Sequence, residues 1–166
     1  PGLVKLAENL PVKFVENSIL YREKDITSKV RTEEVAAVAS KVAAIPEVRA
    51  ALLKRQKDFA QPPGLIADGR DMGTVVFPTA PVKLFLTASA EERAKRRVKQ
   101  LKNQGVDVNI RQITQDIMER DQRDRTRKSS PLVPAEDALQ IDTTSLSIEE
   151  VCQMALNKIH DAGLIK

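Results

Sequence analysis

The densest charge in the sequence lies in ten residues of its last third. The segment from Glu119 to Lys128, ERDQRDRTRK, holds five basic and three acidic side chains. Arg120, Asp124 and Arg127 are spaced i, i+4 and i+7, so a continuous helix would place them on one face. Two guanidinium groups can bind phosphate, and a carboxylate between them can accept hydrogen bonds from a sugar or a base amine. A solvated helix face with its own salt bridges would use the same residues.

A second group of polar residues follows an apolar run. The loop DGRDMGT (68–74) comes directly after GLIA, and ligands of open parallel sheets bind beyond the carboxyl ends of the strands. Gly69 and Gly73 permit close backbone approach, and Arg70 beside Asp71 offers an anion fork next to a hydrogen-bond acceptor. The alternative is a tight turn whose charged side chains are simply exposed.

A third group is basic and is predicted to lie on one helix. It consists of Arg93, Lys95, Arg96, Arg97 and Lys99. Arg93 and Arg97 are four residues apart and could reach a polyphosphate together. A solvated basic face, or weak binding of nucleic acid, would explain the same residues.

Other kinds of site lack their residues in this sequence. None of the six glycines begins or completes the phosphate-binding pattern G-x-x-x-x-G-K-[ST]. A single cysteine, Cys152, and a single histidine, His160, argue against an internal disulfide and a zinc site, and we interpret both as structural. The scarcity of aromatic residues (3%) argues against stacking platforms for single-stranded nucleic acid. The residues alone therefore predict an anion or nucleotide binder without a metal site of its own.

Composition places the chain among globular proteins. Its 166 residues suffice for one compact domain, and 42% are hydrophobic and 30% charged. The net charge of +4 suits an anionic ligand without requiring DNA. Apolar stretches are too short for a membrane span and the start lacks a signal peptide's pattern, so we expect a cytoplasmic protein.

The elements that must position these residues follow the order of an α/β protein. Two short strands are expected within residues 11–26, one helix from Thr32 to about Ala44, and another from Pro46. Apolar runs predict strands of a parallel sheet at 64–68, 82–88 and 138–144. Ser89 and Ser147 each open a capping box, Asn109 with Gln112 is expected to cap a helix, and Gly105 to end the one before it.

Three long strings closely resemble bacterial cytidylate kinase, of the nucleoside monophosphate kinase family. They are GLIADGRDMGTVVFPTAPVKLFLTAS, ERDQRDRTR and PLVPAEDALQIDTTSLSIEEV, and the resemblance extends over essentially the whole chain, including VRTEEVAAVASKVAAIPEVRAALLKRQ. It implies phosphoryl transfer from ATP to CMP or dCMP, with Mg²⁺ held mainly by the substrate phosphates and a P-loop. The implied partners are these nucleotides, with no nucleic acid and no membrane, and we expect a monomer.

The resemblance also implies an architecture. This is a three-layer parallel-sheet P-loop kinase core with a monophosphate-binding insert and a helical lid. Residues 1–44 would form the insert, 45–89 and 129–166 core, and 90–128 the lid with its flanking helices. The chain starts at Pro1, already within the insert, so we expect a P-loop segment to be missing from this sequence and the polypeptide as written to bind ATP poorly.

Site residues carry over by motif. Ser40, Arg120 and Asp124 resemble the family's contacts to the acceptor sugar, and Arg49, Arg70 and Arg127 its arginines facing the monophosphate. Asp71 resembles the carboxylate that reads cytosine, and Arg93 and Arg97 are candidates for the donor phosphates. Among these, Arg70, Arg120 and Arg127 are the expected catalytic residues, because phosphoryl transfer depends on positioning and charge neutralisation. A non-catalytic nucleotide- or RNA-binding module, and an adenylate-type kinase, are the alternatives.

Overall fold

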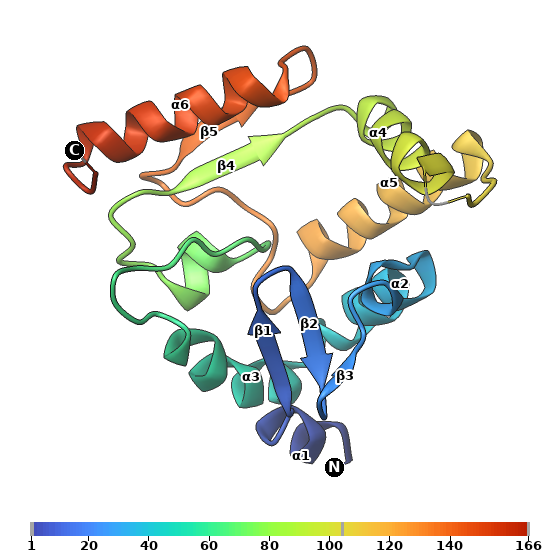
Figure 1. The fold of residues 1–166 in the computed structure, drawn as a ribbon, viewed down its shortest axis with the longest axis horizontal. Helices are drawn as coiled ribbons and strands as arrows, with labels where there is room; N and C mark the ends of the chain where they lie inside the picture. Colours follow the sequence, from blue (N-terminus) through green and yellow to red (C-terminus); the bar gives the residue numbers. More distant parts are fainter. Residues whose placement is uncertain (1, 104, 166) are drawn as a thin grey trace. The chain divides into compact units, whose positions relative to one another are not determined.

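The computed structural model describes residues 2–103 and 105–165, and its contacts divide the chain into two compact units. The first unit contains residues 1–67 and 127–129, and the second contains residues 68–126 and 130–166. Figure 1 follows the chain through both of them.

The first unit combines helices with a small antiparallel sheet. Its helices are α1 (Gly2–Glu8), α2 (Glu33–Val42) and α3 (Pro46–Asp58), with a 3₁₀ turn η1 (Lys29–Arg31) before α2. Strands β1 (Val12–Val15), β2 (Ser18–Tyr21) and β3 (Lys24–Asp25) pair in that order, and α1 packs against α3. The two strands expected within residues 11–26 are thus confirmed, while α1 and the short β3 were not predicted.

Helix starts in the first unit follow their capping residues. The Thr32 hydroxyl accepts the amide N–H of Val35 at 3.4 Å, and Glu33 and Glu34 occupy the first turn of α2. Pro46 is the first residue of α3, where its missing N–H costs no helical hydrogen bond. Both helices therefore begin where the sequence predicted.

The second unit is built around two parallel strands, β4 (Leu84–Thr87) and β5 (Leu139–Asp142). Leu84 pairs with Leu139 and Leu86 with Ile141, so the two apolar runs are in register. A π-helical turn η2 (Met72–Val76) precedes β4, helix α6 (Ile148–Asp161) follows β5, and α4 (Ala90–Asn103) and α5 (Ile110–Thr126) lie between the strands in sequence. The chain has a mixed α/β fold with a small parallel sheet.

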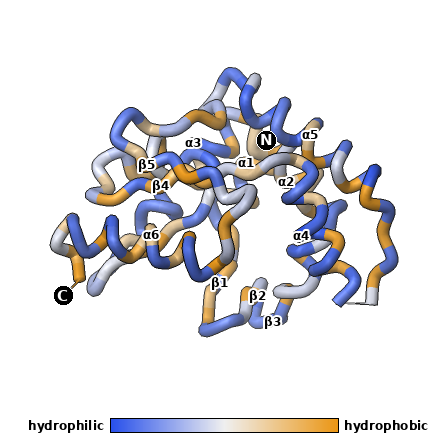
Figure 2. Tube along the Cα trace, turned by 90° about the horizontal axis from the view of Figure 1, so that it is seen from above, coloured by the Kyte–Doolittle hydropathy of each residue, from blue (hydrophilic) through white to orange (hydrophobic). Residues whose placement is uncertain are grey.

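Helices α4 and α5 pack on each other around their own apolar core. Ala94, Leu101 and Ile113 are buried, with Val98, Val108 and Ile117 packed against them. In Figure 2, hydrophobic and hydrophilic residues alternate along α4, as expected for a helix with one buried face. Gly105, at φ +77°, takes the left-handed conformation that commonly ends a helix, and its N–H bonds the Lys102 carbonyl at 2.9 Å.

The strand predicted at residues 64–68 is wrong. The segment runs without regular structure into the loop before η2, and the side chain of Ile66 is 94% exposed. A strand exists only where a neighbouring backbone supplies hydrogen-bond partners, and among the described residues the sheets contain β1 to β3 and β4 with β5, so neither includes residues 64–68. The apolar run therefore does not form a strand by itself.

The two predicted capping boxes differ. At α6 the box is complete: the Ser147 hydroxyl accepts the Glu150 N–H and the Glu150 carboxylate accepts the Ser147 N–H. At α4 the Ser89 hydroxyl accepts from the Glu92 N–H at 3.1 Å, but the Ser89 N–H donates to the Thr144 hydroxyl at 3.0 Å. A side chain from beyond β5 thus takes the place that the sequence pattern assigns to Glu92.

Within the described ranges, no helix combines the length and the apolar character needed to cross a bilayer. Apolar side chains are nevertheless exposed on α6, where Ile148 is 79% and Leu156 49% exposed.

A buried lysine fixes the segment that leads into β4. The side chain of Lys83 is 8% exposed, and its Nζ donates to both carboxylate oxygens of Asp137 at 2.9 and 2.7 Å and to the Pro78 carbonyl at 2.6 Å. These bonds join the loop before β4 to the turn before β5.

We expect this interaction to lose its stabilising effect in acid. The hydrogen bond from Lys83 holds the pKa of Asp137 below its ordinary value of 3.8. A lowered folded-state pKa stabilises the fold above the unfolded value, and the contribution disappears as pH falls through the folded value. Urea midpoints of the wild type and Asp137→Asn should therefore differ slightly at about pH 6, and the difference should shrink as the pH falls below about 4. A constant difference throughout would contradict this assignment.

Candidate active site

A buried carboxylate on α5 holds two arginines in the second unit. Asp124 is 1% exposed; its Oδ2 accepts a hydrogen bond from Arg70 Nε and lies 3.8 Å from Arg120 Nε. The two arginine side chains are 35% and 33% exposed. A charge buried this deeply is tolerated only when it is paired and hydrogen-bonded. The arrangement thus holds both arginines at Asp124, while about a third of each side chain stays exposed.

Local structure explains how these groups meet. Arg120 and Asp124 are one turn apart on α5, as their spacing predicted, whereas Arg70 comes from the loop before η2. The chain turns back after α5, and the Leu132 N–H bonds the Asp124 carbonyl at 2.8 Å. The solvated-face interpretation is therefore wrong for Asp124, which lies inside the unit and not on an exposed face.

Asp71 lies at the entrance to the π-helical turn. It is 6% exposed, and its backbone carbonyl accepts the N–H groups of Val75 at 2.9 Å and Val76 at 3.2 Å. Its neighbour Arg70 is bound to Asp124, so the two adjacent residues of the loop are both held by interactions within this unit. The prediction of a simple exposed turn does not describe Asp71.

Three predicted site residues belong to the other unit. Helix α5 ends at Thr126, so Arg127 lies one residue beyond the helix that carries Arg120. Ser40 is 6% exposed on α2, and Arg49 on α3 donates from Nη1 to the Ala43 carbonyl at 3.1 Å. Arg127, Ser40 and Arg49 thus belong to the first unit, whereas Arg70, Arg120 and Asp124 belong to the second.

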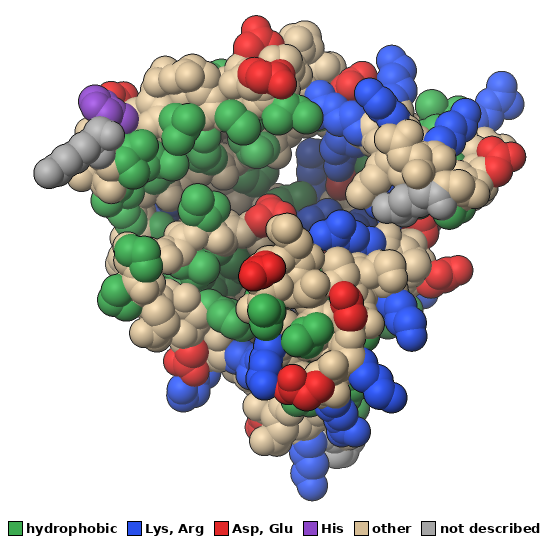
Figure 3. All heavy atoms as spheres, in the orientation of Figure 1, with side chains coloured by type: hydrophobic (Ala, Val, Ile, Leu, Met, Phe, Trp, Pro, Cys, Tyr) green, Lys and Arg blue, Asp and Glu red, His purple; other side chains and the backbone are tan. Residues whose placement is uncertain are grey.

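Three arginines of α4 form hydrogen bonds with other residues of the second unit. Arg93 forms a two-pronged ion pair with Asp121 of α5, with Nη1 at 3.1 Å from Oδ1, and Arg97 donates to Gln100 at 2.8 Å. Arg96 was not singled out for a role, yet it donates to the Thr143 hydroxyl at 3.1 Å and to the Thr143 carbonyl at 2.6 Å. Figure 3 shows Lys and Arg side chains gathered over this part of the unit. Arg97 finds its partner Gln100 on α4 itself, whereas Asp121 and Thr143 come from other elements and could not be found from the i, i+4 spacing within α4.

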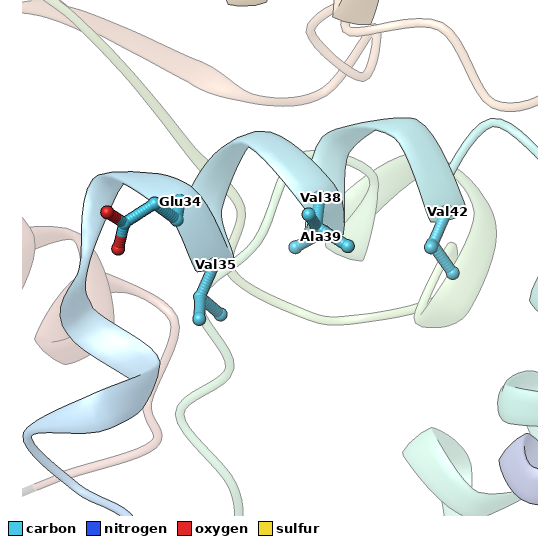
Figure 4. A pocket seen from close by; sticks show the side chains of 5 residues that line it. All are labelled: Glu34, Val35, Val38, Ala39 and Val42. Carbon is cyan, nitrogen blue, oxygen red and sulfur yellow. The ribbon is translucent and has the colours of Figure 1, made fainter.

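A separate hollow lies along α2 in the first unit. Glu34, Val35, Val38, Ala39 and Val42 line it, as Figure 4 shows. The lining is apolar apart from one carboxylate, which would repel a phosphate. Ser40, the buried polar residue of this helix, is not among the lining residues. The hollow therefore lacks the chemistry of a nucleotide-phosphate site.

Comparisons with known proteins cover nearly the whole chain. A sequence profile of the family "Cytidylate kinase" matches residues 1–161. The chain is 59% identical to the cytidylate kinase of Mannheimia succiniciproducens over 162 residues, covering 95% of this chain and 72% of that protein. It is 56% identical to that of Shewanella pealeana, with coverages of 96% and 72%, and 56% identical to that of Stutzerimonas stutzeri, with coverages of 98% and 74%.

The matched residues extend over both units, and the family and the three relatives carry the same name. Sequence identities of 56–59% are far above the range in which two proteins share only a fold. The chain belongs to the cytidylate kinase family.

Proposed function

We propose that this chain acts in ATP-dependent phosphorylation of CMP and dCMP, giving CDP or dCDP and ADP. The observation that carries the proposal is the Asp124 carboxylate, buried between Arg70 and Arg120, in a chain matched to cytidylate kinases over residues 1–161. Guanidinium groups oriented in advance by a buried carboxylate suit an anionic substrate better than mobile surface arginines do.

The proposed roles follow from the demands of phosphoryl transfer. The transferring phosphoryl group needs its reactants aligned and its charge neutralised, and little covalent help from the protein. Arg70, Arg120 and Arg127 would neutralise the phosphate oxygens, while Arg49 binds the acceptor monophosphate. Ser40 and Asp124, with Arg120, would contact the acceptor sugar.

Asp71 is proposed to select the base. Its carboxylate can accept a hydrogen bond from the exocyclic amine of cytosine, whereas uracil presents a carbonyl at that position and would meet the carboxylate with repulsion. Burial strengthens this discrimination, because Asp71 is 6% exposed and water cannot readily substitute for the missing donor.

Mg²⁺ would accompany the nucleotide phosphates. Among residues 2–103 and 105–165, no three or more His, Cys, Asp or Glu side chains are grouped closely enough to hold a metal ion. The residues described do not form a metal cage, and Mg²⁺ commonly binds through substrate phosphates with few protein ligands. We propose that this chain contributes to phosphoryl transfer mainly through its arginines, which would neutralise phosphate charge.

The proposed roles of the segments are those expected from the sequence. Residues 1–44 would bind the monophosphate and residues 90–128 would form the lid and its flanking helices, with the rest belonging to a three-layer core. Arg93 and Arg97 would face the donor phosphates, which requires Arg93 to exchange its bond to Asp121 for one to a phosphate. We place the reaction in the cytoplasm.

The activity is tested by ADP release with ATP and Mg²⁺, adding CMP, dCMP, UMP or AMP in turn. In a preparation that also contains the expected P-loop segment, we expect turnover with CMP and dCMP well above that with UMP or AMP. Preference for AMP would support the adenylate-type alternative. Steeply salt-dependent binding of any RNA, without stabilisation by CMP, would support the RNA-binding alternative.

A base-selectivity experiment tests Asp71 without needing the donor. CMP should raise the melting temperature more than UMP does, since a ligand of the folded state stabilises it according to its affinity. Asp71→Ala should lower CMP affinity about tenfold to a hundredfold, because a hydrogen bond to a charged group contributes about 1.5–3 kcal/mol. The matched control is Asp68→Ala, an exposed carboxylate of the same loop, which should keep the preference. If Asp71→Ala still prefers CMP over UMP as strongly as the wild type does, Asp71 does not select the base.

A further inference from the structure

Lys83 is a charged side chain that the proposed reaction does not use. Its Nζ makes hydrogen bonds to the two oxygens of Asp137 and to the Pro78 carbonyl, one acceptor for each of its three N–H donors. The side chain is 8% exposed. Three hydrogen bonds thus hold its head group in place, and most of its side chain is covered by neighbouring residues.

The aliphatic stem of this side chain lies directly against η2. A Cβ atom added to Gly73 would stand 3.2 Å from Lys83 Cδ, 3.4 Å from Cγ and 3.6 Å from Cβ. The backbone of the π-helical turn therefore rests on the lysine stem, with space for a glycine and little more. Gly73 is the second residue of η2, and the carbonyl of Asp71, the residue before this turn, accepts hydrogen bonds from Val75 and Val76.

These contacts form one continuous support. Asp137 and Pro78 fix the lysine, its stem carries Gly73, and the turn that contains Gly73 holds Asp71. A binding group must be held within about half an ångström of its productive position, and neighbouring residues usually provide that constraint. We propose that Lys83 is a positioning residue for the choice of acceptor base, acting through η2 on Asp71. This inference rests on the proposed function, in which Asp71 reads cytosine.

Stability alone does not account well for this lysine. Asp137, its partner, has a side chain that is 64% exposed, and ion pairs with so exposed a member stabilise a fold only slightly. Lys54 and Asp58 on α3 form an ordinary surface pair, 2.8 Å long, with side chains 85% and 59% exposed. Lys83 differs from Lys54 because its stem packs against the backbone of η2 at Gly73. The Lys54 side chain is 85% exposed and has no comparable packing.

The test compares CMP and UMP affinity by isothermal titration calorimetry on the complete chain. Lys83→Ala removes both stem and head group, and should reduce the ratio of the UMP Kd to the CMP Kd by about tenfold. Lys83→Met keeps a stem beneath Gly73 but loses its anchor, and should reduce the ratio by about threefold. Lys54→Met, the matched control, should leave it unchanged.

Asp71→Ala is measured in parallel, so that the two proposals can be separated. If Asp71→Ala abolishes the preference for CMP and both Lys83 variants retain the wild-type ratio, the positioning role is overturned while the function of Asp71 stands. If Asp71→Ala itself retains the preference, both proposals fail. If Lys83→Ala does not fold, as judged by circular dichroism, Lys83→Met decides the question, and an unchanged ratio there overturns the positioning role.

Discussion

Replacing Asp124 with asparagine should lower the free energy of unfolding by about 2–3 kcal/mol and weaken CMP binding at least about tenfold. Asparagine keeps the shape of the side chain but removes the charge that faces Arg70 and Arg120. Removing one member of a buried ion pair costs about 3–5 kcal/mol, and the lower figure here reflects arginines that are a third exposed. CMP binding falls because both guanidinium groups lose the contact that orients them.

Asp58→Asn is the control for this prediction. Its carboxylate pairs with Lys54 on the surface of α3, and side-chain exposure of 59% limits the expected change to less than about 0.5 kcal/mol. Urea unfolding gives the stability of each variant and calorimetry its affinity for CMP. Equal stability losses in the two variants would show that the burial of Asp124 contributes nothing beyond an ordinary surface pair.

Replacing Arg120 or Arg127 with alanine should weaken acceptor binding or transfer by about 1.5–3 kcal/mol each, which is roughly a tenfold to hundredfold loss. The reason is that each would lose charge-assisted hydrogen bonds to the acceptor. CMP titrations of the single variants measure the effect. For Arg120→Ala, a parallel unfolding curve separates lost binding from the changed environment of Asp124.

Arg123→Ala provides the matched control on the same helix. Its side chain is 42% exposed and lies 4.0 Å from Glu119, a weak surface contact. We expect CMP affinity within about twofold of the wild type. If Arg120→Ala and Arg127→Ala behave like Arg123→Ala, the charged segment is a solvated face with no part in acceptor binding.

Local features of the sequence determined most of the helices and several strands. Thr32 and Ser147 begin helices because their hydroxyls accept backbone N–H groups that have no helical partner, an interaction confined to one turn. Gly105 ends a helix because it adopts positive φ without steric cost. The family was also readable from the sequence, since long strings of residue identities carry far more information than spacing alone.

The strand expected at 64–68 marks one limit of such reasoning. Its composition is that of a strand, but strand formation depends on a partner whose presence no local pattern can specify. Only one half of the capping box at α4 forms, for a related reason. The Ser89 N–H donates to the hydroxyl of Thr144, which is 55 residues away. A rule based on neighbouring residues cannot include an acceptor so distant in the sequence.

The candidate site shows the same division between sequence and tertiary structure. Spacing alone placed Arg120 and Asp124 on one side of a helix, because helical geometry repeats every few residues. Only the tertiary structure decided that Asp124 is buried, that Arg70 reaches it across 54 residues, and that the stem of Lys83 lies beneath Gly73. Burial and long-range pairing depend on how distant segments pack, and the free energy of a buried charge depends on those neighbours rather than on its own local sequence.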